Sequence, residues 1–244
     1  MTIDKSVVED VLNHVNVHDL SEVVIRDDGS FIVASDKKEI FIYGHPESGF
    51  SGFGDLGIGD VGLILKIIKS IDGETVDIEN KQDTLFLEGS SVKHRFRLTD
   101  PLGIVGSQFS NPEETVDLYE DAIWCNADID LTGIVQIAKM LNLYGDDETV
   151  VKVSGKNISM TFGDKRSHWG ELFIAETGLD KNEYLDFLIS GAALKSILSK
   201  VGESLTFGIG TVAGKDNKSE DRHYVRIGVP GYKYFISMLV EEKF

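Results

Sequence analysis

The stretch "LKIIKSIDGE" at residues 65–74 returns in altered form as "LKSILSKVGE" at residues 194–203. Six of the ten positions are identical, and both copies space their apolar residues as one face of an amphipathic helix does. The copies are separated by about half of the 244-residue chain. A repeat of that period indicates two whole domains of similar construction, because solenoid units are much shorter.

The hydrophobic pattern predicts two helices in each half of the chain, among alternating segments typical of half-buried antiparallel strands. The same dipeptide, Ile-Asp, precedes the first helix of both halves, so Asp4 and Asp130 are the expected N-caps. The expected fold is therefore α+β, with two tandem, similar domains that each pack two helices on antiparallel sheets. The four helices are expected at residues 4–15, 60–71, 131–143 and 191–201.

The boundary between the two halves is expected at residues 101–121, which contain two of the four prolines and show no clean periodicity. We interpret this stretch as an interdomain connector. The first domain is then expected at residues 1–100 and the second at residues 122–244.

Charge is distributed unevenly between the helices and the rest of the chain. The chain has 24 Lys and Arg against 41 Asp and Glu, a net charge of −17, which argues against DNA binding over a broad surface. The four helices taken together are not acidic. The helical pattern exposes His14 and buries Leu63, and it places lysines on the polar sides. Any single lysine is ordinary on a solvated helix face, but the concentration of lysines on the helices of an acidic chain carries more weight than any one of them. The lysines concerned are Lys5, Lys66, Lys69, Lys139, Lys195 and Lys200.

No combination of residues predicts catalysis, a cofactor or a metal site. The six histidines are scattered, and "GIGTVAG" at 208–214 looks like a phosphate loop but is not followed by a helix. Asp128 and Asp130 resemble a carboxylate pair, yet Asp130 is better explained as a helix cap. Cys125 is the single cysteine and is expected in the core. Neither a signal peptide nor a membrane-length apolar run is present, so we expect a soluble, cytoplasmic protein without membrane contact.

Three local stretches and the order of elements resemble the sliding clamps of DNA replication. They are the strand "KHRFRLTDP" leading into "LGIV", the helix "LILKIIKSI" after "GIGD", and the C-terminal strand "YKYFISMLVEE". The likeness covers almost the whole chain and is closest to the two-domain, trimeric clamps represented by PCNA and those of tailed phages. It implies a homotrimeric head-to-tail ring that encircles duplex DNA without reading its sequence. The six helix lysines would face the DNA, in the host cytoplasm for a phage clamp or in the nucleus for a eukaryotic one.

The resemblance also implies that the edge at residues 93–100 of one subunit meets the edge at 170–177 of the next. The residues support it independently, because one edge is basic and the other acidic. The alternative is that both edges are covered within one subunit. The charged candidates are Lys93, Arg95, Arg97, Glu171 and Glu176, and the apolar ones are Phe96, Leu98, Leu172 and Ile174.

Clamps of this type tether a DNA polymerase and a clamp loader through peptides that enter an apolar pocket beneath the connector. Apolar residues on a linker need a reason, and a peptide pocket would supply one, although they could also merely hold the connector against the sheets. The matching positions here are Ile40, Leu102, Ile104, Val105, Met238 and Leu239.

Two other classes of protein fit part of the pattern. A monomeric processivity factor of similar fold would bind DNA through a broad basic face, which a net charge of −17 does not favour. A duplicated β-rich virion or carbohydrate-binding protein would carry exposed aromatic residues on loops, for which Trp169 is the one candidate.

Overall fold

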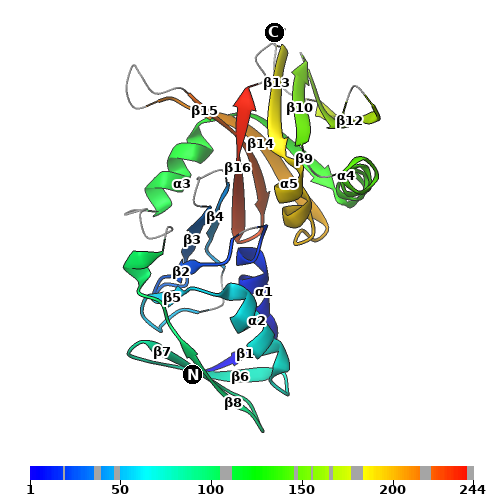
Figure 1. The fold of residues 1–244 in the computed structure, drawn as a ribbon. Helices are drawn as coiled ribbons and strands as arrows, with labels where there is room; N and C mark the ends of the chain where they lie inside the picture. The colour runs from blue at the N-terminus through cyan, green and yellow to red at the C-terminus, as the bar shows by residue number, and fades with distance from the viewer. Residues whose placement is uncertain are drawn as a thin grey trace. The chain divides into compact units, whose positions relative to one another are not determined.

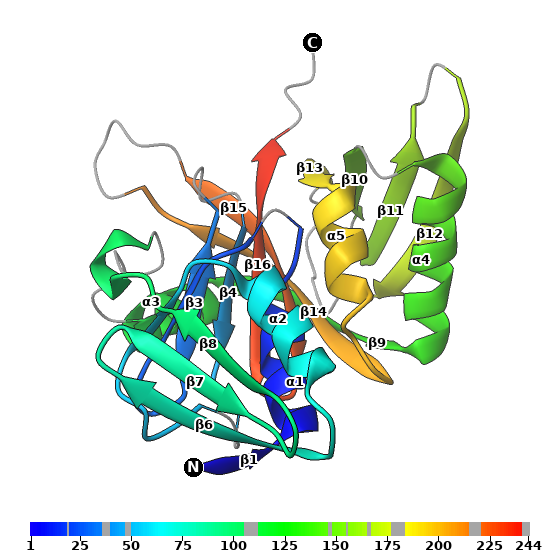
Figure 2. The same ribbon diagram turned by 60° about the horizontal axis from the view of Figure 1, so that its bottom comes forward.

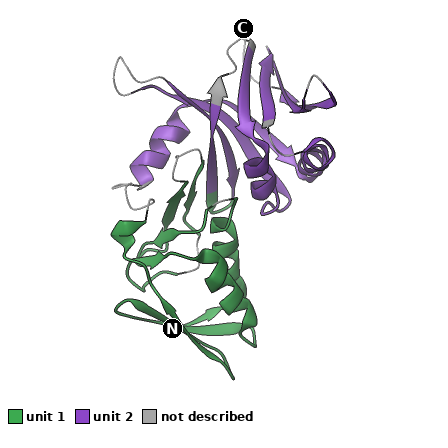
Figure 3. Cartoon of the chain, in the orientation of Figure 1, with its two compact units in different colours: residues 1–112, 230–232 green, residues 113–229, 233–244 purple. Residues whose placement is uncertain are grey.

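The computed structural model describes residues 1–18, 20–35, 40–46, 50–104, 112–145, 148–154, 156–164, 167–176, 184–214 and 221–240. Within these residues the chain forms five α-helices, one 3-10 helix and sixteen strands (Figure 1). The chain divides into two compact units, one of residues 1–112 and 230–232 and the other of residues 113–229 and 233–244 (Figure 3). Every described strand pair within a unit is antiparallel, and the α+β class is confirmed.

The first unit builds two sheets, with strand orders β1-β6-β7-β8 and β4-β3-β2-β5. Its two α-helices, α1 and α2, pack against each other (Figure 2). The elements are β1 Thr2–Asp4, α1 Lys5–Val15, β2 Val23–Ile25, β3 Phe31–Ala34, β4 Ile40–Gly44, β5 Leu56–Ile58, α2 Val61–Ser70, β6 Thr75–Lys81, β7 Thr84–Glu88, β8 Lys93–Arg97 and the 3-10 helix η1 Pro101–Gly103.

The second unit follows the same plan with longer strands. Its strand orders are β12-β11-β10-β13-β16 and β9-β14-β15, and α4 packs against α5. The elements are α3 Pro112–Asp121, β9 Ile123–Asp130, α4 Leu131–Tyr144, β10 Glu148–Ser154, β11 Asn157–Gly163, β12 Trp169–Glu176, β13 Tyr184–Ser190, α5 Gly191–Leu198, β14 Ser204–Val212, β15 Arg222–Val229 and β16 Tyr232–Val240.

The four helices expected from the hydrophobic pattern all form, and each begins after a side chain that caps it. The Asp4 carboxylate accepts a hydrogen bond from the Ser6 amide, and Asp130 accepts one from the Gly133 amide. Asp60 caps α2 in the same way, as Ser190 caps α5. These side chains satisfy amide groups that have no acceptor within the helix, which explains why the helices begin where they do.

The repeated helix keeps its buried face in both units. Leu65 and Ile68 of α2 are buried, as are Leu194 and Ile197 at the matching positions of α5. The prediction that Leu63 is buried was wrong, because its side chain is 47% exposed. The face of α2 that meets the core is centred on Leu65 and Ile68, and Leu63 lies outside that arc.

The prediction that His14 is exposed was also wrong. The His14 ring is buried and stacks on the Tyr232 ring, with 3.7 Å between centroids and 12° between planes. The Tyr232 hydroxyl in turn donates to the Asp10 carboxylate at 2.7 Å. Aromatic stacking therefore holds a polar side chain in the core of the first unit.

The stretch 101–121, expected to be an irregular connector, contains the helices η1 and α3, while residues 105–111 lie outside the described part of the chain. The missed signal is "PEE" at residues 112–114, where a proline opens the helix and two acidic residues occupy its first turn. Val116 is buried. A single buried position with few apolar neighbours is too weak a pattern to show as helical periodicity.

Candidate nucleic-acid interface and subunit edges

In the first unit, α2 carries an exposed basic pair. Lys66 and Lys69 are both exposed, and no acidic residue occurs from Val61 to Ser70. The packed face of the helix forces its polar residues outward, so the two ammonium groups lie on the side away from the core. Helix α2 itself therefore contributes two positive side chains and no negative one to its exposed face.

In the second unit, both helices of the pair contribute lysines. Lys139 on α4 is exposed, whereas Lys195 on α5 and Lys200 just after it are half-buried. Neither α4 nor α5 contains an acidic residue. The structure thus groups three of the predicted lysines on one helix pair of the second unit and two on α2 of the first.

Lys5, the sixth predicted lysine, is turned toward the end of α2. Its Nζ donates to the Ile71 carbonyl at 2.7 Å and to the Lys69 carbonyl at 3.4 Å, and it lies 3.8 Å from the Glu9 carboxylate. The last carbonyls of a helix have no amide partner and carry partial negative charge, so an ammonium group there stabilises the helix end. The geometry gives Lys5 a structural role in the first unit.

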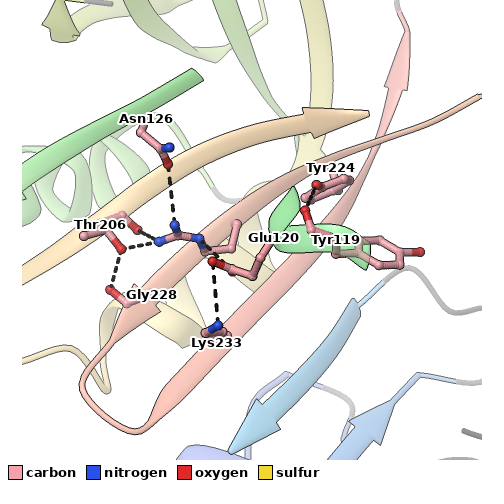
Figure 4. Close-up of polar contacts among 8 residues, drawn as sticks. Tyr119, Glu120, Asn126, Thr206, Tyr224, Gly228 and Lys233 are labelled. Atoms are coloured by element: carbon pink, nitrogen blue, oxygen red, sulfur yellow. Dashed lines mark hydrogen bonds and ion pairs between the residues drawn. The ribbon is translucent and has the colours of Figure 1, made fainter. Parts of the chain in front are cut away.

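Helix α3 has the opposite charge to these helices. It contains five acidic residues and no basic one, and it is fixed to the second unit by a polar cluster (Figure 4). The Arg226 Nε lies 3.1 Å from the Glu120 carboxylate, without the alignment of a hydrogen bond, and Lys233 Nζ lies 3.7 Å from the same group. Arg226 also donates to Thr206. These contacts keep one carboxylate of α3 against the sheet and leave most of the others exposed.

An aromatic group supports the same attachment. The Tyr224 hydroxyl donates to the Tyr119 carbonyl, and the rings of Tyr119, Tyr224 and Phe235 contact one another edge-on or tilted. Burial, followed by the neighbouring Glu120 carboxylate, raises the pKa of Tyr224, so this hydroxyl stays protonated as a donor.

The two predicted edge strands are the last strands of their sheets among the described residues: β8 ends the first-unit sheet and β12 ends the second-unit sheet. On β8, Lys93, Arg95 and Arg97 are all exposed. Lys93 Nζ lies 2.6 Å from the Glu88 carboxylate, and that hydrogen bond raises the pKa of Lys93. Arg97 lies 3.6 Å from Asp83.

The acidic residues of β12 are exposed as well. Glu171 accepts from the Ser159 hydroxyl at 2.8 Å and lies 3.4 Å from Lys152, whereas Glu176 is exposed at the end of the strand. Ile174 falls in a β-bulge, because the pairing with β11 shifts between its neighbours. The apolar candidates differ in exposure: Phe96 is buried, while Leu98, Leu172 and Ile174 are half-buried.

The predicted pocket residues occur in both units. In the first, Ile40 and Ile104 are buried, whereas Leu102 on η1 is 85% exposed. In the second, Met238 is buried. Val105 and the side chain of Leu239 lie outside the described part of the structure. Leu102 is thus the one exposed apolar side chain among the described members of this set, and the pocket stays a prediction.

Other sequence candidates have structural explanations. Cys125 is buried on β9, and its burial raises the pKa of the thiol to about 11. The first part of "GIGTVAG" is strand, since β14 extends to Val212. Among the described residues, no group of three or more His, Cys, Asp and Glu side chains is placed to hold a metal ion. No helix in this part of the chain has both the length and the apolar character needed to cross a bilayer.

Two units that each pack a capped helix pair on antiparallel sheets define the fold of the DNA sliding clamps, and this chain has that fold. No family model matches the sequence, and the search among curated proteins found no match either. The likeness is therefore carried by three-dimensional structure.

Several solved clamps are similar to this chain. A DNA polymerase III beta subunit from Borrelia burgdorferi matches 98% of it with a TM-score of 0.70 and 15% identity, and the chain spans 63% of that subunit. A chain of the PCNA2–PCNA3 complex from Sulfolobus tokodaii matches 100% of this chain over 100% of its own length, with a TM-score of 0.63 and 12% identity. A. fulgidus PCNA, bound to the C-terminal region of FEN-1, matches 99% of this chain and 98% of its own with a TM-score of 0.68 and 14% identity.

Proposed function

We propose that this protein is a DNA sliding clamp: a non-catalytic processivity factor that encircles duplex DNA as a head-to-tail homotrimer and tethers a DNA polymerase. The observation that carries the proposal is the charge of three of the four paired helices on a clamp fold. In a chain of net charge −17, α2, α4 and α5 carry lysines and no acidic residue. The DNA-facing residues are Lys66, Lys69, Lys139, Lys195 and Lys200.

The weak positive charge of these helices suits a protein that slides. Each phosphate contact releases counterions and strengthens binding, so a densely basic surface would hold the duplex in one place. A few lysines inside a closed ring are enough to keep the DNA centred. Dissociation is prevented by the closed ring and does not depend on the affinity of the lysines for the phosphates. The acidic remainder of the chain repels DNA from every other surface.

Ring closure joins β8 of one subunit to β12 of the next. An uncovered strand edge offers unpaired backbone donors and acceptors, and pairing two edges satisfies both. The basic residues Arg95 and Arg97 on one edge and the acidic Glu171 and Glu176 on the other favour this head-to-tail contact over a pairing of identical edges. Phe96, Leu98, Leu172 and Ile174 supply its apolar part, and Lys93 its third basic charge.

Partners of the proposed ring bind through short peptides. The similar PCNA from A. fulgidus was solved with the C-terminal region of FEN-1 bound, which shows that this fold can hold such a segment. In this chain the exposed Leu102 is the most accessible candidate anchor. The proposed pocket contains it with Ile40, Ile104, Val105, Met238 and Leu239, and would receive peptides of a DNA polymerase and a clamp loader. The protein would act wherever that DNA is copied, in a bacterial cytoplasm or a nucleus.

The test is the native mass measured by light scattering over a dilution series, followed by DNA retention. A species near three times 26.9 kDa that dissociates on dilution is expected. Subunits diluted and then concentrated with a nicked circular plasmid should stay on the circle in high salt and leave once the plasmid is linearised. The variant Arg95→Glu with Arg97→Glu, which loses the basic edge, is the matched control and should remain monomeric. A wild-type monomer at every concentration would contradict the ring and leave a surface-binding processivity factor.

A further inference from the structure

The edge strand β12 carries two large aromatic residues that its own unit leaves uncovered. Trp169 is 50% exposed and Phe173 is 56% exposed. They lie four residues apart on a strand, so they share one face with Glu171 between them. The other face is covered by α4, as shown by Gly170, where a Cβ would come within 2.6 Å of side-chain atoms of Met140 and Tyr144. The aromatic residues therefore point away from the helix layer.

On the edge strand β8 of the first unit, basic residues likewise lie on the face that points away from the helix layer. His94 faces the helix layer, since its Nε2 lies 3.3 Å from the Ser70 hydroxyl of α2. The alternating residues Lys93, Arg95 and Arg97 consequently project from the opposite face and are exposed. Among the described residues, Arg95 has neither a hydrogen bond nor an ion pair, although both of its basic neighbours do.

We propose that these two faces meet when a second copy of the chain docks, with Arg95 opposite Glu171, Arg97 over the Trp169 ring and Lys93 over the Phe173 ring. This inference rests on the proposed ring, because it specifies the register of β8 against β12. Antiparallel pairing would continue the antiparallel pattern that both sheets already have. Because every second residue of a strand lies on the same face, this register places three cationic side chains of β8 opposite two rings and one carboxylate of β12. A cation over an aromatic face and an ion pair at the centre then act together.

The chemistry of the patch favours a second copy over other occupants. An exposed tryptophan and phenylalanine on an open strand edge promote aggregation unless something covers them. A partner strand with basic residues at every second position fits both the rings and the carboxylate between them. Glu171 is exposed on this face, accepts a hydrogen bond from the Ser159 hydroxyl and lies 3.4 Å from Lys152, so its carboxylate is a positioned negative charge that an incoming guanidinium group would meet. The β8 strand of this same chain has that sequence.

The experiment measures whether Trp169 becomes buried as the protein assembles. Trp124 is the other tryptophan, and Trp124→Phe makes Trp169 the single reporter. Emission spectra and sedimentation velocity are recorded on the same dilution series. We expect the emission maximum to move to shorter wavelength in step with assembly. Trp169→Ala, made in the natural background, should weaken association by about tenfold. Leu143→Ala, which removes a still more exposed apolar residue from α4, should leave association unchanged.

The outcomes separate this contact from the ring itself. If the protein assembles while Trp169 emission stays constant and Trp169→Ala associates normally, the contact is wrong and the ring stands. If the protein is monomeric at all concentrations, the ring fails and the contact fails with it. Trp124→Phe loses the hydrogen bond from the indole to Thr211. Should that variant not fold, the association constants of Trp169→Ala and Leu143→Ala decide the question without it.

Discussion

The helix pairs of the two units are built from the same repeat but exchange a lysine and an apolar residue. In the first unit Lys5 follows the N-cap of α1, and Ile71 follows the last residue of α2. In the second unit the matching positions hold Leu131 at the start of α4 and Lys200 after α5. Ile71 is buried, whereas Leu131 is 52% exposed. The repeat preserves the helices, and the units differ at the helix ends.

This exchange decides which lysines are available for binding. In the first unit the Lys5 ammonium is held by the Ile71 and Lys69 carbonyls, so it stabilises the end of α2. In the second unit the corresponding leucine cannot do so, and Lys200 occupies the place of the buried isoleucine. We therefore expect the second unit to present three lysines to DNA and the first unit two, although the unmodified repeat would predict equal numbers.

The largest expected effect tests what the units share. Ile68 and Ile197 occupy matching positions, and both are fully buried. Replacing either with alanine leaves a cavity, so each variant should lower the free energy of unfolding by about 2 to 5 kcal/mol. Urea unfolding followed by circular dichroism measures this. Leu63→Ala on the exposed side of α2 is the control and should cost less than about 1 kcal/mol. A cost confined to one of the two isoleucine variants would contradict the equivalence of the repeated helices.

Much of this helix framework was predictable from the sequence, because it depends on local rules. The N-caps Asp4 and Asp130 and the buried residues of α4 follow from spacing alone. The predictions failed where a tertiary contact outweighs periodicity. His14 is buried because a tyrosine far along the chain stacks on it. Helix α3 has a clear start signal but only a weak apolar stripe, so periodicity could not reveal it.

The candidate site divides in the same way. Exposure of Lys66, Lys69 and Lys139 follows from the helical period, since each lies outside the buried arc of its helix. The role of Lys5 does not, because a long flexible side chain can reach a neighbouring helix that the sequence does not place beside it. The exposed ring of Phe173 was likewise hidden in an ordinary alternating strand, and the sequence suggested Trp169 only as an aromatic residue on a loop. Their exposure becomes visible only once β12 is known to end its sheet.

The next largest effect concerns DNA and sharpens the difference between the units. Lys66→Glu with Lys69→Glu reverses the charge of α2, and Lys139→Glu with Lys195→Glu reverses that of α4 and α5. Each double variant should weaken binding to a duplex on the order of tenfold at low salt, because two favourable contacts become repulsive. Fluorescence anisotropy at several salt concentrations measures both affinity and its salt slope, which should fall by about one for each lysine.

The matched control for these variants is Lys81→Glu with Lys156→Glu. Both lysines are exposed but lie outside the helices, so the net charge changes equally while the helix faces stay intact. An equal loss of affinity in this control would mean that overall charge governs binding, and it would count against a DNA-facing role for the helix lysines. A loss in only one of the two helix-pair variants would show that the units do not share the DNA.

The smallest effect separates structural from binding lysines within the first unit. Lys5→Met keeps most of the side-chain volume but removes the ammonium group from the Ile71 carbonyl, and should lower the free energy of unfolding by about 1 to 2 kcal/mol. Lys66→Met removes the same charge from an exposed position and should change stability by less than about 0.5 kcal/mol. Their DNA affinities should follow the reverse order, with only Lys66→Met weakened. If Lys5→Met weakened DNA binding as much as Lys66→Met, the Lys5 ammonium would have to leave the end of α2 when DNA binds, and the exchange between the units would have no consequence for binding.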